Sequence, residues 1–205
     1  MKQGLLIVVS GPAGSGKGTV LGRILNDPAH AGEFVYSVSA TTRMPRPGEQ
    51  NGVNYHFLSR EEFERRIAAG ELLEYTEYCG NYYGTLKSET EAVLDSGKNL
   101  LLEIEVMGAM NVKRRYPNAI AIMLLPPSFA TQEARLRGRG TEPEEKIVAR
   151  LQRTREELQE LGGYDYVVYN HDGAVDTVIE DIYAILRAEA CRTVRNKNAA
   201  ADYFA

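Results

Sequence analysis

The chain has 205 residues, 43% hydrophobic and 25% charged, which is the composition of an ordinary globular protein and excludes fibrous and disordered classes. Its 24 lysines and arginines are outnumbered by 28 aspartates and glutamates, so no basic field is available to bind a nucleic-acid backbone. No apolar run is long enough to span a bilayer or to act as an export signal. We therefore expect one cytoplasmic domain that has neither a nucleic acid nor a membrane as a partner.

The chain opens with a continuous apolar run, Leu5–Val9, which predicts a strand buried on both faces. A glycine-rich turn follows, and then a helix whose apolar side chains lie on one side. Residues 34–85 depart from this pattern, because they are rich in Tyr, Thr, Arg, Gly and Asn. They predict short strands at Val53–Leu58 and Leu72–Tyr78 around a helix near Glu61–Ala69. We expect this segment to be a small β-rich insertion.

The later segments alternate between strands and helices. Apolar runs predict strands at Leu100–Ile104, Ala119–Leu125 and Val167–Val168, and an apolar stripe predicts a helix over Ala174–Arg187. This alternation predicts an α/β fold of three layers with a mostly parallel sheet. Charged residues dominate 135–155, which we expect to form an arginine-rich helical lid. The core then comprises residues 4–33, 86–134 and 156–187, and the polar tail of residues 188–205 is expected to fray.

A phosphate-binding loop is predicted directly after the first strand. The segment from Gly11 to Lys17 fits the pattern G-x-x-x-x-G-K and lies between a buried strand and a helix. Glycines let successive N–H groups converge on phosphate oxygens, and the helix N-terminus and the lysine add positive charge. A glycine-rich turn without a ligand is the weaker alternative. Gly18 stands where a Mg²⁺-ligating hydroxyl is usual, and the hydroxyl comes one place later at Thr19. We expect either that Thr19 contacts phosphate instead or that Mg²⁺ is held largely through substrate phosphates and water.

A second anion site is predicted around Arg43 and Arg46, which lie three residues apart in a stretch that Pro45 and Pro47 keep extended. The guanidinium group suits bidentate binding of a phosphate. Neighbouring tyrosines add neutral hydroxyl donors. From these residues alone, solvated surface arginines remain an alternative.

Five motifs that occur together and in order resemble the guanylate kinase family, and the resemblance runs from about Gly4 to Arg187. The motifs span residues 10–19, 39–46, 80–85, 102–108 and 139–142. The resemblance implies a P-loop kinase core that transfers the γ-phosphoryl group of ATP to GMP, in purine nucleotide metabolism. It also implies Mg²⁺ as the cofactor, dGMP as a second candidate acceptor, and a monomer or a homodimer.

The resemblance further assigns roles to individual residues. Those that match ATP-binding positions are Gly11, Pro12, Ala13, Gly14, Ser15, Gly16, Lys17, Gly18, Thr19 and Asn170. Those that match positions gripping the GMP phosphate are Arg43, Arg46, Tyr55 and Tyr83, and those facing the guanine edge are Ser39, Glu74, Thr85 and Glu105. The expected catalytic groups are Lys17, Arg43, Arg135, Arg139 and Arg150, with Glu103 near Mg²⁺.

The guanine-edge residues suit guanine chemically, because carboxylates accept from its N1–H and exocyclic amine while hydroxyls donate to its O6. Adenine would leave the same groups unpaired. Two residues depart from the family pattern: Glu105 stands where some relatives carry Asp, and Met107 stands where Gln is usual. A kinase of another phosphorylated acceptor, such as a ribose bisphosphate, remains an alternative. A non-catalytic phosphopeptide-binding domain is a less favoured one.

Overall fold

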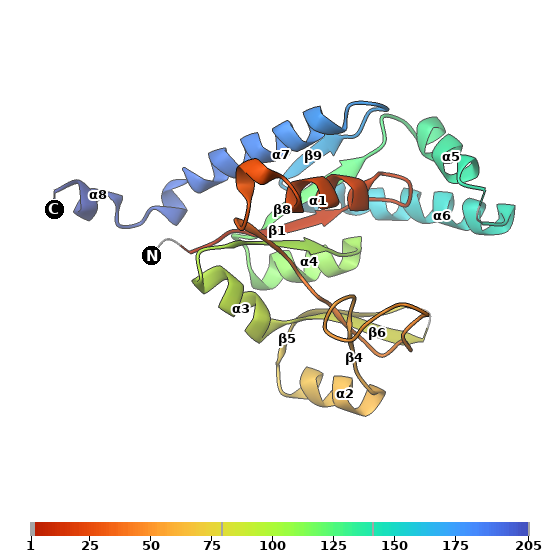
Figure 1. Cartoon of the computed structure of the whole chain (residues 1–205), viewed down its shortest axis with the longest axis horizontal. Coiled ribbons are helices and arrows are strands. Elements are labelled where there is room, and N and C mark those ends of the chain that lie inside the picture. Colours follow the sequence, from red (N-terminus) through yellow and green to blue (C-terminus); the bar gives the residue numbers. More distant parts are fainter. Residues whose placement is uncertain (1–2, 79, 141, 205) are drawn as a thin grey trace.

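The computed structural model describes residues 3–78, 80–140 and 142–204, so Thr141 of the 139–142 motif lies outside it. A five-stranded sheet has the strand order β2-β7-β1-β8-β9, and its described strands all pair in parallel (Figure 1). Its strands are β1 (Leu6–Ser10), β2 (Phe34–Tyr36), β7 (Asn99–Glu103), β8 (Ile120–Leu125) and β9 (Tyr166–Tyr169). The predicted α/β fold with a parallel sheet is confirmed.

The strand order brings the functional loops to one edge of the large sheet. The chain leaves β1 for β2 on one side, and β8 and β9 extend the sheet on the other side. Val9 pairs with Glu103 and Ser10 pairs with Met123, so β1, β7 and β8 end side by side. In parallel sheets ligands bind beyond the carboxyl ends of such strands, where the connections diverge.

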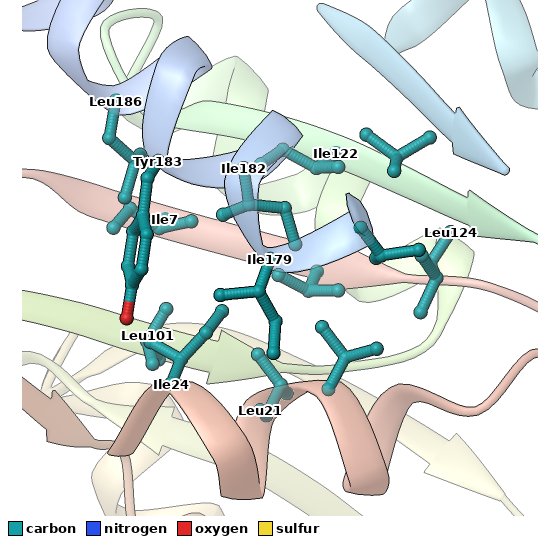
Figure 2. Packing of buried hydrophobic residues seen from close by; sticks show 14 of the residues in the cluster. Ile7, Leu21, Ile24, Leu101, Ile122, Leu124, Ile179, Ile182, Tyr183 and Leu186 are labelled. Atoms are coloured by element: carbon teal, nitrogen blue, oxygen red, sulfur yellow. The ribbon is translucent and has the colours of Figure 1, made fainter. Parts of the chain in front are cut away.

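Helices cover both faces of the large sheet, because alternate strand residues point to opposite sides. Ile7 and Val9 of β1 belong to the cluster under α1 (Lys17–Leu25) and α7 (Val175–Ala190), while Leu6 and Val8 belong to the opposite cluster. Figure 2 shows the first cluster, in which Ile24 of α1 and Ile182 of α7 meet the sheet. Each fully buried aliphatic side chain contributes about 1.5–3 kcal/mol. On the opposite face lie α3 (Lys87–Asp95) and α4 (Val106–Arg115).

A second, four-stranded sheet has the order β4-β3-β6-β5. Its elements are β3 (Ala40–Thr41), β4 (His56–Phe57), α2 (Arg60–Ala68), β5 (Leu72–Tyr78) and β6 (Asn81–Leu86). The helix α2 begins where the Ser59 hydroxyl accepts from the Glu62 N–H, and it packs on the sheet through the buried Phe63.

Two sequence predictions for this region are corrected. The strand expected at Val53–Leu58 is reduced to His56–Phe57, because Val53 is 63% exposed and its N–H donates to the Gln50 carbonyl in a turn. The insertion expected to begin at residue 34 begins later, because Phe34–Tyr36 pairs with β7 in the large sheet.

The expected lid, residues 135–155, takes in the end of α5 (Phe129–Gly138) and most of α6 (Glu144–Glu157), which lie on the right of Figure 1. Short helical turns η1 (Pro28–His30), η2 (Leu158–Gly163) and η3 (Thr193–Arg195) and the helix α8 (Ala199–Tyr203) complete the chain. The expected fraying after residue 188 is wrong as far as Arg195, whose guanidinium donates to Glu189 at 3.0 Å and to the Asn118 carbonyl at 2.6 Å. Among the described residues, no helix is long and apolar enough to cross a membrane.

Candidate active site

The glycine-rich loop between β1 and α1 has room only for glycine at two positions. A Cβ atom on Gly11 would lie 2.1 Å from the Leu124 carbonyl oxygen, and one on Gly16 would lie 2.3 Å from the Asn170 Nδ2. Gly16 also adopts a φ of 88°, in the left-handed region that glycine tolerates best. Asn170, which is buried, donates from Nδ2 to the Ser15 carbonyl at 2.8 Å. Asn170, directly after β9, therefore holds the loop in place through this hydrogen bond.

Lys17 begins α1 and folds back over the loop. Its Nζ donates to the carbonyl oxygens of Gly11 at 2.6 Å and Pro12 at 3.4 Å. Burial lowers the pKa of Lys17, and the nearby carboxylates of Glu103 and Glu157 oppose this effect. The Ser15 hydroxyl is buried without a hydrogen-bond partner among the described residues. An unsatisfied buried hydroxyl in such a loop suits a ligand that brings its own acceptors.

A cavity of about 240 Å³ lies between the small sheet and the end of β7. Five residues expected to contact the acceptor line it, and so does the carboxylate expected near the metal, Glu103. The five are Ser39, Tyr55, Glu74, Tyr83 and Glu105. We call it the acceptor cavity. Thr85 lies behind it and donates from its hydroxyl to the Glu74 carboxylate at 2.8 Å.

Glu74 is only 3% exposed, and burial raises its pKa to about 7. Desolvation disfavours the charged form, and the hydrogen bond from Thr85 only partly offsets this cost. A buried carboxyl of this kind, aimed into a cavity, is typical of a functional site.

The two arginines of the second anion site lie beside the acceptor cavity and do not line it. The Arg43 guanidinium lies 5.4 Å from the centre of the Tyr55 ring and donates to Glu49 at 2.9 Å. The Arg46 side chain is exposed, while its backbone N–H donates to Glu49 at 2.7 Å. Arg43 thus contacts the wall of the cavity through Tyr55, and Arg46 lies further out.

A second cavity joins the phosphate loop to the acceptor cavity. It is lined by residues of the loop, of the end of β7 and of α6: Gly11, Ala13, Lys17, Tyr78, Glu103, Ile104, Glu105, Arg150, Arg153 and Glu157. We call it the transfer cavity. Glu103, Ile104 and Glu105 also line the acceptor cavity, so the two spaces meet along the segment that leaves β7.

The three lid arginines expected from the sequence reach different places. Arg135 donates to the carbonyls of Asn170 at 2.7 Å and Gly14 at 3.1 Å, and therefore braces the loop from the side away from the acceptor cavity. Arg139 lines a third cavity together with Gly16, Thr19 and Asn170. Arg150 lines the transfer cavity and is paired with Glu142 at 2.7 Å.

Comparisons with known proteins agree with this geometry. The guanylate kinase family model matches residues 3–189. The chain belongs to the guanylate kinase family. It is 50% identical over 194 residues to the guanylate kinase of Halalkalibacterium halodurans, covering 95% of this chain and 93% of that one. It is 46% identical over 192 residues to the guanylate kinase of Desulfitobacterium hafniense, covering 94% of each.

The fold of this guanylate kinase family member also matches a crystal structure of guanylate kinase from Anaplasma phagocytophilum. The TM-score is 0.74 at 33% sequence identity, with 95% of this chain and 90% of that chain covered. The chain therefore shares its fold with that guanylate kinase.

Sequence reasoning missed Arg153 and Glu157, which both line the transfer cavity. The helix α6 carries many charges of both signs, and no local pattern marks which ones face inward. The available signal was spacing, because Arg153 and Glu157 stand three and seven residues after Arg150 and share its side of a helix. Met107, noted as a departure from the family pattern, is 56% exposed and lines neither the acceptor nor the transfer cavity.

Proposed function

We propose that the chain transfers the γ-phosphoryl group of ATP to GMP and releases ADP and GDP. Family membership over nearly the whole chain supports this activity. The observation that carries the proposal is the transfer cavity, which joins Lys17 and its loop to a cavity lined by buried and half-buried carboxylates. A donor phosphate at one end and an acceptor phosphate at the other would meet there.

On the donor side, the backbone N–H groups of the loop residues after Pro12 and the start of α1 bind the ATP phosphates. Lys17 exchanges its present carbonyl partners for phosphate oxygens, which is favourable because the anions compensate its buried charge. Thr19, Arg139 and Asn170 line the third cavity, and we assign this space to the nucleoside of ATP.

On the acceptor side, Glu74 and Glu105 accept from the N1–H and the exocyclic amine of guanine. Thr85 uses its single hydroxyl hydrogen on Glu74, so it orients that carboxylate, and Ser39 is left to donate to O6. Tyr55 and Tyr83 donate to the GMP phosphate. Arg43 and Arg46 supply positive charge behind the tyrosines.

Adenine would leave the Glu74 oxygen that is not bonded to Thr85 without a donor in a buried site. The loss discriminates strongly against adenine, because a buried polar group without a partner loses its hydration and gains no hydrogen bond in return. The arrangement therefore favours a guanine acceptor. Because none of the assigned contacts needs the ribose 2′-hydroxyl, dGMP is a second acceptor in this proposal.

The chemistry needs no covalent nucleophile, because an oxygen of the GMP phosphate is anionic at neutral pH and attacks the γ-phosphorus directly. Catalysis then consists of alignment and of charge compensation on the transferred group. Lys17 and Arg150 compensate this charge at the transfer site, Arg43 acts from the acceptor side, and Arg135 and Arg139 act from the donor side.

The residues present fit Mg²⁺ held mainly through substrate. Glu103 ends β7 in the transfer cavity, so one carboxylate is available there, and the buried Ser15 hydroxyl in the loop has no hydrogen-bond partner among the described residues. Mg²⁺ accepts such a site because it keeps several waters and binds phosphate oxygens. When bound, it would neutralise charge on the ATP phosphates.

Two alternatives are less well supported. A kinase of a ribose bisphosphate would have no use for Glu74 buried against Thr85, and a phosphopeptide-binding domain would not need the loop around Lys17. The decisive test is a coupled assay of ADP formation with GMP, dGMP, AMP and a ribose bisphosphate as acceptors. We expect activity with GMP, less or equal activity with dGMP, and very little with the others. The cytoplasmic location and the monomeric or dimeric state stay predictions.

A further inference from the structure

An ion pair between Arg153 and Glu105 links the expected lid to the acceptor cavity, and the roles assigned above give it no function. Arg153 lies on α6, three residues after Arg150. Its guanidinium donates from one terminal nitrogen to the Glu105 carboxylate and from Nε to Glu157 at 2.9 Å. It also lies 4.8 Å from the centre of the Tyr78 ring. One side chain therefore contacts α6, the end of β5 and the segment after β7.

Glu105 has little else to orient it. It stands directly before α4, its side chain is 47% exposed, and among the described residues Arg153 makes the one hydrogen bond to its carboxylate. Glu74, by contrast, is buried and bonded to Thr85. A half-exposed glutamate without a partner would sample several rotamers and so would bind a flat base edge weakly.

We propose that Arg153 is a positioning residue that orients Glu105 toward the guanine edge and thereby adds to the preference for guanine. This inference rests on the proposed function. A carboxylate has two oxygens and about four acceptor sites, so a guanidinium on one side leaves the other side free for the donors of the base. Arg153 therefore acts through Glu105 and has no need to contact GMP.

The same pair connects acceptor binding to the transfer site. Arg150 and Arg153 stand on one face of α6, and both line the transfer cavity. An acceptor that fixes Glu105 also fixes Arg153 and, through the rigid helix, Arg150. GMP therefore favours the arrangement of α6 in which Arg153 pairs with Glu105, and this arrangement also fixes the position of Arg150.

The pair is suited to this role because it contributes little to folding. Arg153 is 37% exposed and Glu105 47%, and ion pairs that exposed stabilise proteins only slightly. We therefore expect Arg153→Met to fold. Arg155→Met is the matched control, since Arg155 lies on the same helix and packs on the Phe129 ring at 5.1 Å, outside both cavities.

The test is steady-state kinetics with GMP and with IMP, which keeps the N1–H and O6 but lacks the exocyclic amine. For Arg153→Met we expect the KM for GMP to rise about tenfold, the value of one charge-assisted hydrogen bond, with the KM for ATP unchanged. The preference for GMP over IMP should fall by a similar factor. Arg153→Lys should restore part of it, because a lysine can pair with Glu105 but not with Glu105 and Glu157 together.

A second variant separates positioning from general damage. Glu105→Asp withdraws the carboxylate by one methylene, so in that background Arg153→Met should add little to the KM for GMP. An Arg153→Met enzyme with the wild-type KM and the wild-type preference for GMP over IMP would overturn the inference. So would equal losses with GMP and IMP, or additive losses in the double variant. An unmodified chain that fails to phosphorylate GMP would instead refute the proposed function.

Discussion

The buried carboxyl of Glu74 makes the stability of this protein depend on pH in a calculable way. Its pKa in the folded protein is about 7, against an ordinary value of 4.5, and burial is the principal cause. The unfolded chain therefore loses this proton at lower pH than the folded protein does. The stability penalty is absent below about pH 4.5, grows as the pH rises, and is complete above about pH 7.

The size of the penalty follows from the two pKa values. One pH unit of difference corresponds to 1.36 kcal/mol, so the span from 4.5 to about 7 predicts a loss of roughly 3 kcal/mol at alkaline pH. Between about pH 5 and about pH 8 the change is roughly 2 to 3 kcal/mol. The Glu74→Gln variant keeps the shape of the side chain and removes the titration, so its stability should lack this component.

The assay is urea unfolding of the nucleotide-free protein at several pH values, with the difference between Glu74→Gln and the unmodified chain plotted against pH. We expect the variant to gain roughly 2 to 3 kcal/mol relative to the unmodified chain between about pH 5 and about pH 8. Thr76→Ser, on the same strand and without an ionisable group in either form, is the control and should give a flat difference. Parallel stability curves for Glu74→Gln and the unmodified chain would refute the reasoning.

Three further predictions concern the phosphate sites. Lys17→Met should lower kcat about a hundredfold or more and leave GMP affinity by calorimetry unchanged; an unaltered kcat would contradict its role. Gly16→Ala should abolish ATP binding in fluorescence titrations, because its methyl would lie 2.3 Å from Asn170, whereas Gly22→Ala, with no atom within 4 Å, should bind normally. Arg43→Lys keeps the charge but not the fork, so the KM for GMP should rise about tenfold at constant KM for ATP; a change confined to ATP would count against the assignment.

Local features of the sequence predicted much of the fold. The run Leu5–Val9 is buried because every residue in it is apolar. The loop that follows needs glycine at Gly11 and Gly16, because a Cβ atom there would clash with neighbouring atoms. The stripe on α7 packs on the sheet as its spacing predicts. These features need no knowledge of distant residues, and for this reason they could be predicted.

Features that depend on distant pairing could not be predicted. Phe34–Tyr36 has no apolar alternation, and it joins the large sheet only because Leu100 and Leu101 offer a free strand edge. The tail is ordered as far as Arg195 because Glu189 is buried and needs a charged partner. Likewise, the inward place of Arg153 depends on how α6 packs against the rest of the protein, which is a tertiary property.

The charges that line the transfer cavity show why the phosphates need positive charge beyond that of Lys17. Its carboxylates, Glu103, Glu105 and Glu157, are equal in number to its cations, Lys17, Arg150 and Arg153. The site is therefore close to neutral before substrates bind, and two sets of phosphates would leave a large negative excess in it. Charge must come from outside the cavity, and Mg²⁺ together with Arg43, Arg135 and Arg139 can supply it. Because Mg²⁺ enters with the ATP phosphates and the acceptor phosphate enters with GMP, we expect neither nucleotide alone to complete the site and water to be a poor acceptor.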